Sequence, residues 1–181
     1  MVGAENFPTR LYAEHRAIEA VLGRLDAGGP PLEDLRLLGC LQRLLIPHLA
    51  AEEEHLYPLV RRHLSAGGPL ADVGAHTHAT IRRLLEQALE AQTSPTGRRA
   101  TAALLIVLRA HLHGEEQRLF PALRARAAPE ELRRCERRLH AGRPEPPASP
   151  VWGLPPGTGA IAAVRDHLTG HDTSSQRRGS P

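Results

Sequence analysis

Apolar residues recur every three or four positions along most of the first 126 residues, which is the spacing of one face of an α-helix. Clusters rich in Gly and Pro interrupt this pattern near Gly28, Gly67 and Pro95. The uninterrupted segments predict four helices, over residues 8–26, 33–63, 72–91 and 97–126. A shorter fifth helix is predicted over residues 129–140, because Pro129 suits the first turn of a helix.

No segment alternates apolar and polar residues with a period of two, so the pattern predicts an all-α protein. Short connections between long helices favour an up-down-up-down antiparallel four-helix bundle, to which the short fifth helix is added. The sequence also repeats itself: His48 and Glu52 lie 63 positions before His111 and Glu115. The first predicted helix pair therefore resembles the second, and two such pairs can close one core around a twofold axis.

The composition changes after Gly142, where residues 143–159 become dense in Pro and Gly. Such a segment cannot build a core. We therefore predict one folded domain over residues 1–141 and a disordered C-terminal tail over 142–181. Trp152, the single Trp of the chain, offers an anchor for a protein partner of the tail.

The composition excludes several function classes. Hydrophobic residues make up 41% of the chain, which is enough for a core, although aromatic residues reach only 3%. All 23 basic residues are Arg, but 20 acidic residues nearly balance them and no nucleic-acid motif is present, so no nucleic-acid partner is expected. The absence of a long apolar run predicts no membrane span, and the N-terminus lacks a signal-peptide pattern, so a cytoplasmic location is expected.

Histidine and glutamate side chains lie on the apolar faces of the predicted helices. His15 and His78 each lie on the apolar face of one helix, and His48-x-x-x-Glu52 recurs 63 positions later as His111-x-x-x-Glu115. A separation of four residues places both side chains one turn apart on the same helix face. The six candidate ligands that we expect to meet at one depth of the bundle are His15, His48, Glu52, His78, His111 and Glu115.

Burying these groups without partners is expensive, since an unpaired buried carboxylate costs several kcal/mol, on the order of what one metal ion can offset. A mixed set of imidazole and carboxylate ligands suits iron, manganese or zinc better than copper(I) or calcium. Any one of these histidines alone would be an ordinary buried residue. Six such groups in the register of the repeat predict a metal site.

These motifs, with Leu56-Tyr57-Pro58 and Leu119-Phe120-Pro121 after them, resemble the hemerythrin-like HHE cation-binding family over residues 8–140. The resemblance implies a four-helix bundle that holds a non-haem di-iron centre, two iron ions joined by an oxo or hydroxo bridge, rather than zinc or manganese. It also implies that Glu52 and Glu115 bridge the two ions. His15 and His48 would serve mainly one ion, and His78 and His111 the other.

The sequence departs from the oxygen-carrying members of this family at one position. Those proteins have a further histidine one turn before the residue that corresponds to His78, and here that position is Gly74. His76 is near in sequence but lies on a different helix face. The departure predicts an open coordination position, which favours reaction with oxygen, peroxide or nitric oxide over reversible oxygen carriage.

Alternative ligand sets remain open from the sequence. Glu52-x-x-His55 is a ferritin-type pair, but its counterpart in the repeat ends in Arg118, which makes a ferritin-like site the weaker interpretation. Glu116 could replace Glu115 as a ligand. We expect Glu53 and Glu116 to lie outside the ligand set, and Tyr57 to close one end of the core or to hydrogen-bond a bound ligand.

The leading functional hypothesis is a metal-binding protein that binds or senses oxygen, reactive oxygen species, nitric oxide or iron, with no catalytic residues assigned. One alternative is a small di-iron peroxidase, or a repair protein that donates iron under nitric oxide stress. Another is a zinc-bound or metal-free helical module that binds proteins. The expected partners are a diatomic ligand or peroxide, and a protein at the tail.

Overall fold

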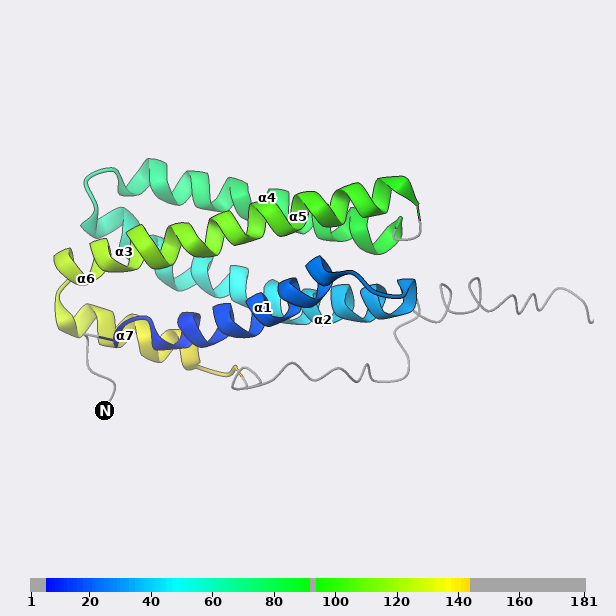
Figure 1. The fold of residues 1–181 in the computed structure, drawn as a ribbon. Helices are drawn as coiled ribbons and strands as arrows, with labels where there is room; N and C mark the ends of the chain where they lie inside the picture. The colour runs from blue at the N-terminus through cyan, green and yellow to red at the C-terminus, as the bar shows by residue number, and fades with distance from the viewer. Residues whose placement is uncertain (1–5, 92–93, 144–181) are drawn as a thin grey trace, which may run out of the picture.

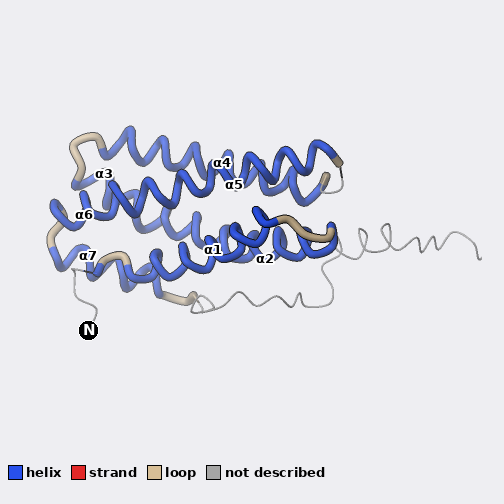
Figure 2. The backbone as a smooth tube through the Cα atoms, viewed as in Figure 1, coloured by secondary structure: helices blue, strands red, loops and turns tan. Residues whose placement is uncertain are grey.

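The computed structural model describes residues 6–91 and 94–143, and every regular element in these ranges is a helix. The prediction of an all-α fold is therefore confirmed for the described part of the chain (Figure 2). The elements are α1 (Thr9–Ala27), α2 (Pro31–Ala51), the π-helical turn η2 (Glu52–Leu56), α3 (Tyr57–His63), α4 (Gly67–Glu90), α5 (Pro95–Gly114), the π-helical turn η3 (Glu115–Leu119), α6 (Phe120–Arg126) and α7 (Pro129–His140).

Four long helical segments lie lengthwise beside one another, and α7 lies along the start of α1 (Figure 1). Helix α1 contacts α2 and α5, while α4 contacts the same two helices, so these four surround one interior. Local signals explain where they begin: Pro31, Pro95 and Pro129 each occupy the first turn of a helix, and the Ser94 hydroxyl accepts a hydrogen bond from the Gly97 N–H at 3.1 Å.

Helix α4 begins at Gly67, so the predicted start at residue 72 was wrong. The Gly-Gly-Pro sequence of residues 67–69 indicated a turn, but the first four N–H groups of a helix need no acceptor within it, so Pro69 fits there. Gly67 also allows a tight turn after α3. A Cβ atom at this position would lie 2.1 Å from the Val60 carbonyl oxygen.

The internal repeat extends to the local structure of the two longest helical segments. In both, an α-helix changes to one π-helical turn and then resumes, at Glu52–Leu56 and at Glu115–Leu119, which are 63 positions apart. Pro58 and Pro121 follow these turns at matching positions, where neither can donate a backbone hydrogen bond. The π-helical turns begin at the two predicted ligand carboxylates and alter the helix register there.

Two apolar clusters fill the interior, one toward each end. The first contains Ile18, Leu41 and Leu108 among its members, and the second contains Leu11 and Phe120 among others, with α7 packed onto it. The predicted site residues occur in each helix between members of the two clusters. The polar groups therefore form a layer between two apolar layers, which excludes water from both sides.

Several further expectations meet the structure here. Cys40 and Cys135 are both buried and unpaired, and burial raises the pKa of the Cys135 thiol to about 12. Within the described ranges, no helix is both long and apolar enough to cross a membrane. The cytoplasmic location stays a prediction. Most of the predicted tail, Trp152 included, lies outside the described residues.

Candidate metal centre

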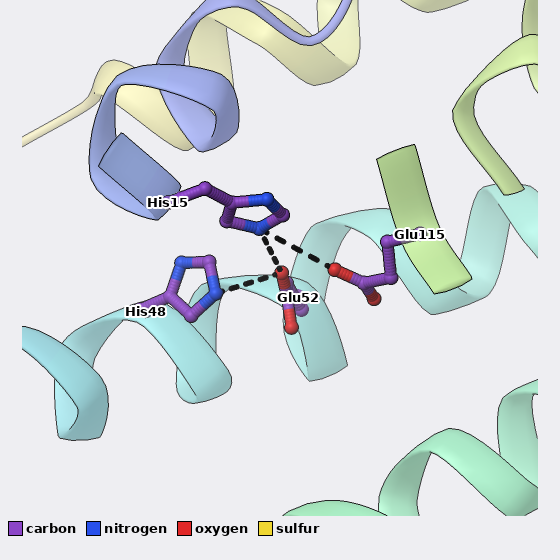
Figure 3. A group of neighbouring side chains, drawn as sticks. All are labelled: His15, His48, Glu52 and Glu115. Atoms are coloured by element: carbon purple, nitrogen blue, oxygen red, sulfur yellow. Dashed lines mark ion pairs between the residues drawn. The ribbon is translucent and has the colours of Figure 1, made fainter. Parts of the chain in front are cut away.

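Four candidate ligands from four elements converge at one point of the polar layer (Figure 3). His15 comes from α1, His48 from α2, Glu52 from η2 and Glu115 from η3. The Nε2 atom of His48 lies 3.1 Å from Glu52 Oε1, and that of His15 lies 3.8 Å from the same oxygen and 3.5 Å from Glu115 Oε2. We call these four residues the first group.

A second group adjoins the first and shares Glu52 with it. Its other members are His78 of α4 and His111 of α5, whose Nε2 atoms lie 3.3 Å apart. The second carboxylate oxygen of Glu52, Oε2, lies 3.1 Å from His78 Nε2 and 3.5 Å from His111 Nε2. Each oxygen of Glu52 thus faces a different group. Glu115 Oε2 is also 3.9 Å from His111 Nε2, at the boundary between the groups.

The donor atoms fit a metal better than they fit one another. The side chains of His15, His48, Glu52 and His78 are at most 1% exposed, and those of His111 and Glu115 are nearly as buried. Yet five of the facing atoms have no hydrogen-bond partner: His15 Nε2, His48 Nε2, both oxygens of Glu52 and Glu115 Oε2. Because nitrogen and oxygen ligands bind such metals at about 2.0–2.2 Å, neighbouring ligands lie about 3–3.6 Å apart, close to the spacing seen here.

The metal-free groups perturb one another strongly. Burial lowers the pKa of His48, but the charge of Glu52 and a hydrogen bond to Glu14 outweigh it and raise that pKa to about 9. Burial raises the pKa of Glu52, but the surrounding histidines hold it well below its usual range. Glu115 differs, because burial and the neighbouring Glu52 charge together raise its pKa. Protons thus partly balance the carboxylates where a cation would do so fully.

Three of the four histidines have a carboxylate behind the ring. The Nδ1 atom of His15 lies 2.9 Å from Glu116, that of His48 lies 2.9 Å from Glu14, and that of His78 lies 2.7 Å from Glu53. When Nδ1 carries the proton and donates it to a carboxylate, Nε2 keeps its lone pair for a metal. Glu53 and Glu116 therefore lie outside the two groups, as the sequence predicts, and orient the histidines.

Glu14 was not predicted as part of the site. Its side chain is 7% exposed and accepts hydrogen bonds from Arg10 at 2.7 Å and from Arg143 at 2.6 Å, besides its contact with His48. The sequence did contain a signal, because Glu14 lies three residues after Leu11 and four before Ile18, on the buried face of α1. Arg143 follows α7 and lies beyond the predicted domain boundary, so sequence spacing gave no reason to connect it with His48.

The position left open by Gly74 is filled by a tyrosine. A Cβ atom at Gly74 would lie 2.4 Å from the Tyr57 hydroxyl oxygen, so the ring occupies the space that a larger residue would need. The hydroxyl oxygen lies 2.8 Å from His78 Nε2. Since His78 Nδ1 donates to Glu53, the tyrosine O–H donates to Nε2, the same atom that faces Glu52.

The remaining sequence candidates lie elsewhere. His76 is exposed on α4, and His55 faces Glu54 at 3.8 Å, so neither belongs to the two groups. Arg118, a possible partner of Glu115 or Glu116, forms no ion pair with any described carboxylate. The six predicted ligands do come together, whereas the ferritin-type pairing of Glu52 with His55 finds no support in their positions.

The chain was compared with known proteins in three ways. The family model described as the Hemerythrin HHE cation binding domain matches residues 6–123, which is well over half of the chain. The comparisons with curated proteins and with solved structures give no match. Both His-x-x-x-Glu motifs, His15 and His78 lie within the matched range, in buried clusters that could hold a metal ion. The chain therefore belongs to the hemerythrin HHE cation-binding domain family.

Proposed function

We propose that the two groups hold a pair of non-haem iron ions, and that the protein binds or senses oxygen, reactive oxygen species or nitric oxide there. The observation that carries this proposal is Glu52. Its two oxygens face different histidine pairs, and both are buried without a hydrogen-bond partner. A carboxylate placed in this way suits a bridge between two cations, whereas a single zinc ion would leave one group unsatisfied.

Each residue has a definite part in this proposal. His15 and His48 would hold one ion and His78 and His111 the other, with Glu52 between them and Glu115 at their boundary. Bound iron would supply one-electron chemistry toward a diatomic ligand or peroxide. The protein would supply orientation, because Glu116, Glu14 and Glu53 fix three imidazole rings, and it would supply dryness, because apolar clusters lie on both sides.

Tyr57 supports ligand binding beside the second group. Its hydroxyl donates to His78 Nε2 in the metal-free chain, and that nitrogen is the proposed metal ligand. Once Nε2 binds a metal, the buried hydroxyl needs another acceptor, which an oxygen species or nitric oxide at the open position would provide. The same reasoning supports peroxide turnover as the second candidate activity, because the hydroxyl could deliver a proton to an incoming peroxide.

The proposed arrangement of the chain follows the same logic. We infer an up-down-up-down antiparallel bundle of the four long helical segments over residues 1–141, supported by the mutual contacts of α1, α2, α4 and α5. In such a bundle the two His-x-x-x-Glu segments lie at one depth. Each begins the π-helical turn of its own helix at the glutamate.

The test is iron content per chain after iron-replete anaerobic expression, with absorption spectra recorded before and after reduction and exposure to air. We expect about two irons per chain and near-ultraviolet bands that disappear on reduction; the carboxylates and histidines above set this expectation. Glu52→Gln should lose most iron from both groups. Glu54→Gln is the matched control, because Glu54 lies in the same π-helical turn with its side chain 75% exposed.

Three outcomes would count against the proposal. A single zinc ion, or no metal in the unmodified protein, would favour the helical interaction module. Full iron content in the Glu52→Gln variant would show that this carboxylate is not the shared ligand. If iron is present, turnover of peroxide or nitric oxide faster than by free iron would favour the enzymatic alternative over sensing.

A further inference from the structure

A hollow between α4 and α5 leads from the surface to the second group. It has a volume of about 720 Å³. Tyr57, His111 and Glu115 form its inner wall, and its outer parts are mostly aliphatic. Small residues create the space, since Gly74 and Gly114 stand where side chains would fill it. Its size and its mixture of apolar wall and few polar groups are those of small-molecule sites, which span about 300–1,000 Å³.

The hollow is elongated. A second hollow of about 310 Å³ adjoins it further along α4 and shares Val73, Thr77 and Val107 with it. Together the two form a groove that runs along α4 and α5, which we call the α4–α5 groove. An elongated groove with aliphatic walls fits a flexible hydrocarbon chain better than a compact polar molecule.

The rim of the groove leaves large apolar side chains in water. Ile106 is 71% exposed, Val73 is 65% exposed and Leu70 is 46% exposed, and all three line the larger hollow. They make up three of the four large apolar residues that are exposed among the described residues. Such clustering marks a binding surface, because apolar surface gains free energy when a ligand covers it.

One cation lies in this groove. The Arg118 guanidinium lies over Gly114, where a Cβ atom would be 3.3 Å from its terminal nitrogen, and the group forms no ion pair with a described carboxylate. The acid in the lining, Glu115, is buried and faces the histidines instead. A guanidinium binds carboxylates through two parallel hydrogen bonds, so an anionic head group complements this end of the groove.

We propose that the α4–α5 groove binds an aliphatic monocarboxylate, with its carboxylate at Arg118 and its chain along Val73, Thr77 and Val107. The bound chain covers the exposed rim and closes the route to the inner wall. This inference relies on the proposed function only for the consequence that the ligand controls access to the second group. Binding itself depends on residues that are present without any metal.

The first experiment titrates decanoate into the metal-free full chain by isothermal calorimetry, below the concentration at which decanoate forms micelles. 1-Decanol, which has the same chain length but no charge, is the comparison ligand. We expect saturable binding of one decanoate per chain, at least about tenfold tighter than decanol. Measuring the metal-free protein ensures that carboxylate coordination to iron does not contribute.

Two variants separate the head group from the chain. Arg118→Gln should bring decanoate and decanol to nearly equal affinity, whereas Arg126→Gln, an exposed Arg outside the groove, should leave their ratio unchanged. Val73→Asp should weaken both ligands at least about tenfold, since it places a charge on the path of the chain. Ile46→Asp is its control, because Ile46 is 43% exposed on α2, away from the groove.

The absence of saturable decanoate binding would overturn the inference, as would an unchanged ratio in Arg118→Gln. Sedimentation supplies a further decisive outcome. If the protein is a dimer that Val73→Asp converts to monomers, and decanoate does not bind, then the rim is an interface between two copies of the chain. Decanoate binding without iron in the cell-derived protein would sink the proposed function alone, and two irons without decanoate binding would sink this inference alone.

Discussion

The two groups of candidate ligands share Glu52 but differ in their surroundings. In the first group, both histidines are held from behind by carboxylates, and Glu14 is itself fixed by Arg10 and Arg143. In the second group, His78 is held by Glu53, whose side chain is 36% exposed, and no described carboxylate lies behind His111. The first group is enclosed, whereas the second reaches the inner wall of the α4–α5 groove.

This difference suggests a division of labour within one site. A ligand set that is fully supported and shielded from water holds a metal firmly, since the carboxylates behind the histidines fix their orientation. A set with one mobile support, a tyrosine hydroxyl and an opening can exchange a ligand. We therefore expect perturbations of the first group to reduce metal retention and stability, and perturbations of the second to change reactivity.

The largest expected effect is that of Glu14→Ala compared with Glu53→Ala. Removing Glu14 leaves Arg10 and Arg143 without their shared buried carboxylate and His48 without support. We expect a loss of about 3–5 kcal/mol in the free energy of unfolding and a 10- to 100-fold weaker hold on metal. Glu53→Ala should cost less than about 1 kcal/mol, because its pair with Arg82 is half in water.

Urea denaturation of the metal-free chains measures the first quantity, and competition with a chelator measures the second. Equal losses of stability in the two variants would contradict the contrast between an enclosed and an open group. A loss of metal in Glu53→Ala that exceeds the loss in Glu14→Ala would reverse the assignment of the firmly held ion.

The next effect concerns the tyrosine that occupies the open side. Gly74→Ala would place a Cβ atom 2.4 Å from the Tyr57 hydroxyl oxygen and 2.6 Å from the ring carbon that bears it. The ring has to move, and we expect a loss of about 1–3 kcal/mol in stability, as for an overpacked core. Gly68→Ala is the control, because a Cβ atom there meets nothing within 4 Å and alanine favours the helix by up to about 1 kcal/mol. Thermal unfolding of both variants decides, and equal melting temperatures would contradict the close packing.

The sequence could predict the ligands because their positions follow from helix periodicity and from the repeat. His48 and Glu52 lie one turn apart on an apolar face, and the same pair recurs at His111 and Glu115. Patterns of this kind depend on local geometry, which the order of residues largely determines. The helix limits were predicted for the same reason, except at Gly67, where a proline within a first turn has the same sequence signal as a loop.

What the sequence could not predict are contacts between segments that are distant along the chain. Arg143 meets Glu14 across 129 positions, and no periodicity connects them. The fit of Tyr57 against Gly74 depends on the crossing of α3 and α4, so the missing histidine predicted an open position but not the ring that fills it. The support of a site arises from tertiary packing, which local spacing does not encode.

A smaller effect is expected for Arg143→Met, which tests a residue beyond the matched family domain. Arg143 contributes one of two guanidinium contacts to Glu14, and its side chain is 16% exposed. Its loss should reduce stability by about 1.5 kcal/mol, the size of one hydrogen bond to a charged group, and speed the removal of metal by a chelator. Arg143→Lys should restore part of both. The control Arg133→Met removes an exposed pair with Glu130 and should change stability by less than about 0.5 kcal/mol. If the two variants behave alike, Arg143 does not support the first group.

The smallest expected effect on stability is that of Tyr57→Phe, which removes one hydroxyl from the second group. Burial raises the pKa of this tyrosine, with the charge of Glu52 adding to the shift, so the hydroxyl stays protonated and donates to His78. Its loss should cost about 1 kcal/mol in the metal-free chain. Iron content should not change, whereas the absorption bands of the loaded protein and its rate of reoxidation in air should, because the hydroxyl lies beside the open position. Tyr12→Phe is the control, since that hydroxyl contacts Arg124 at 3.4 Å and lies outside both groups. Unchanged bands and reoxidation in Tyr57→Phe would place ligand exchange away from the second group and remove the basis for the division of labour.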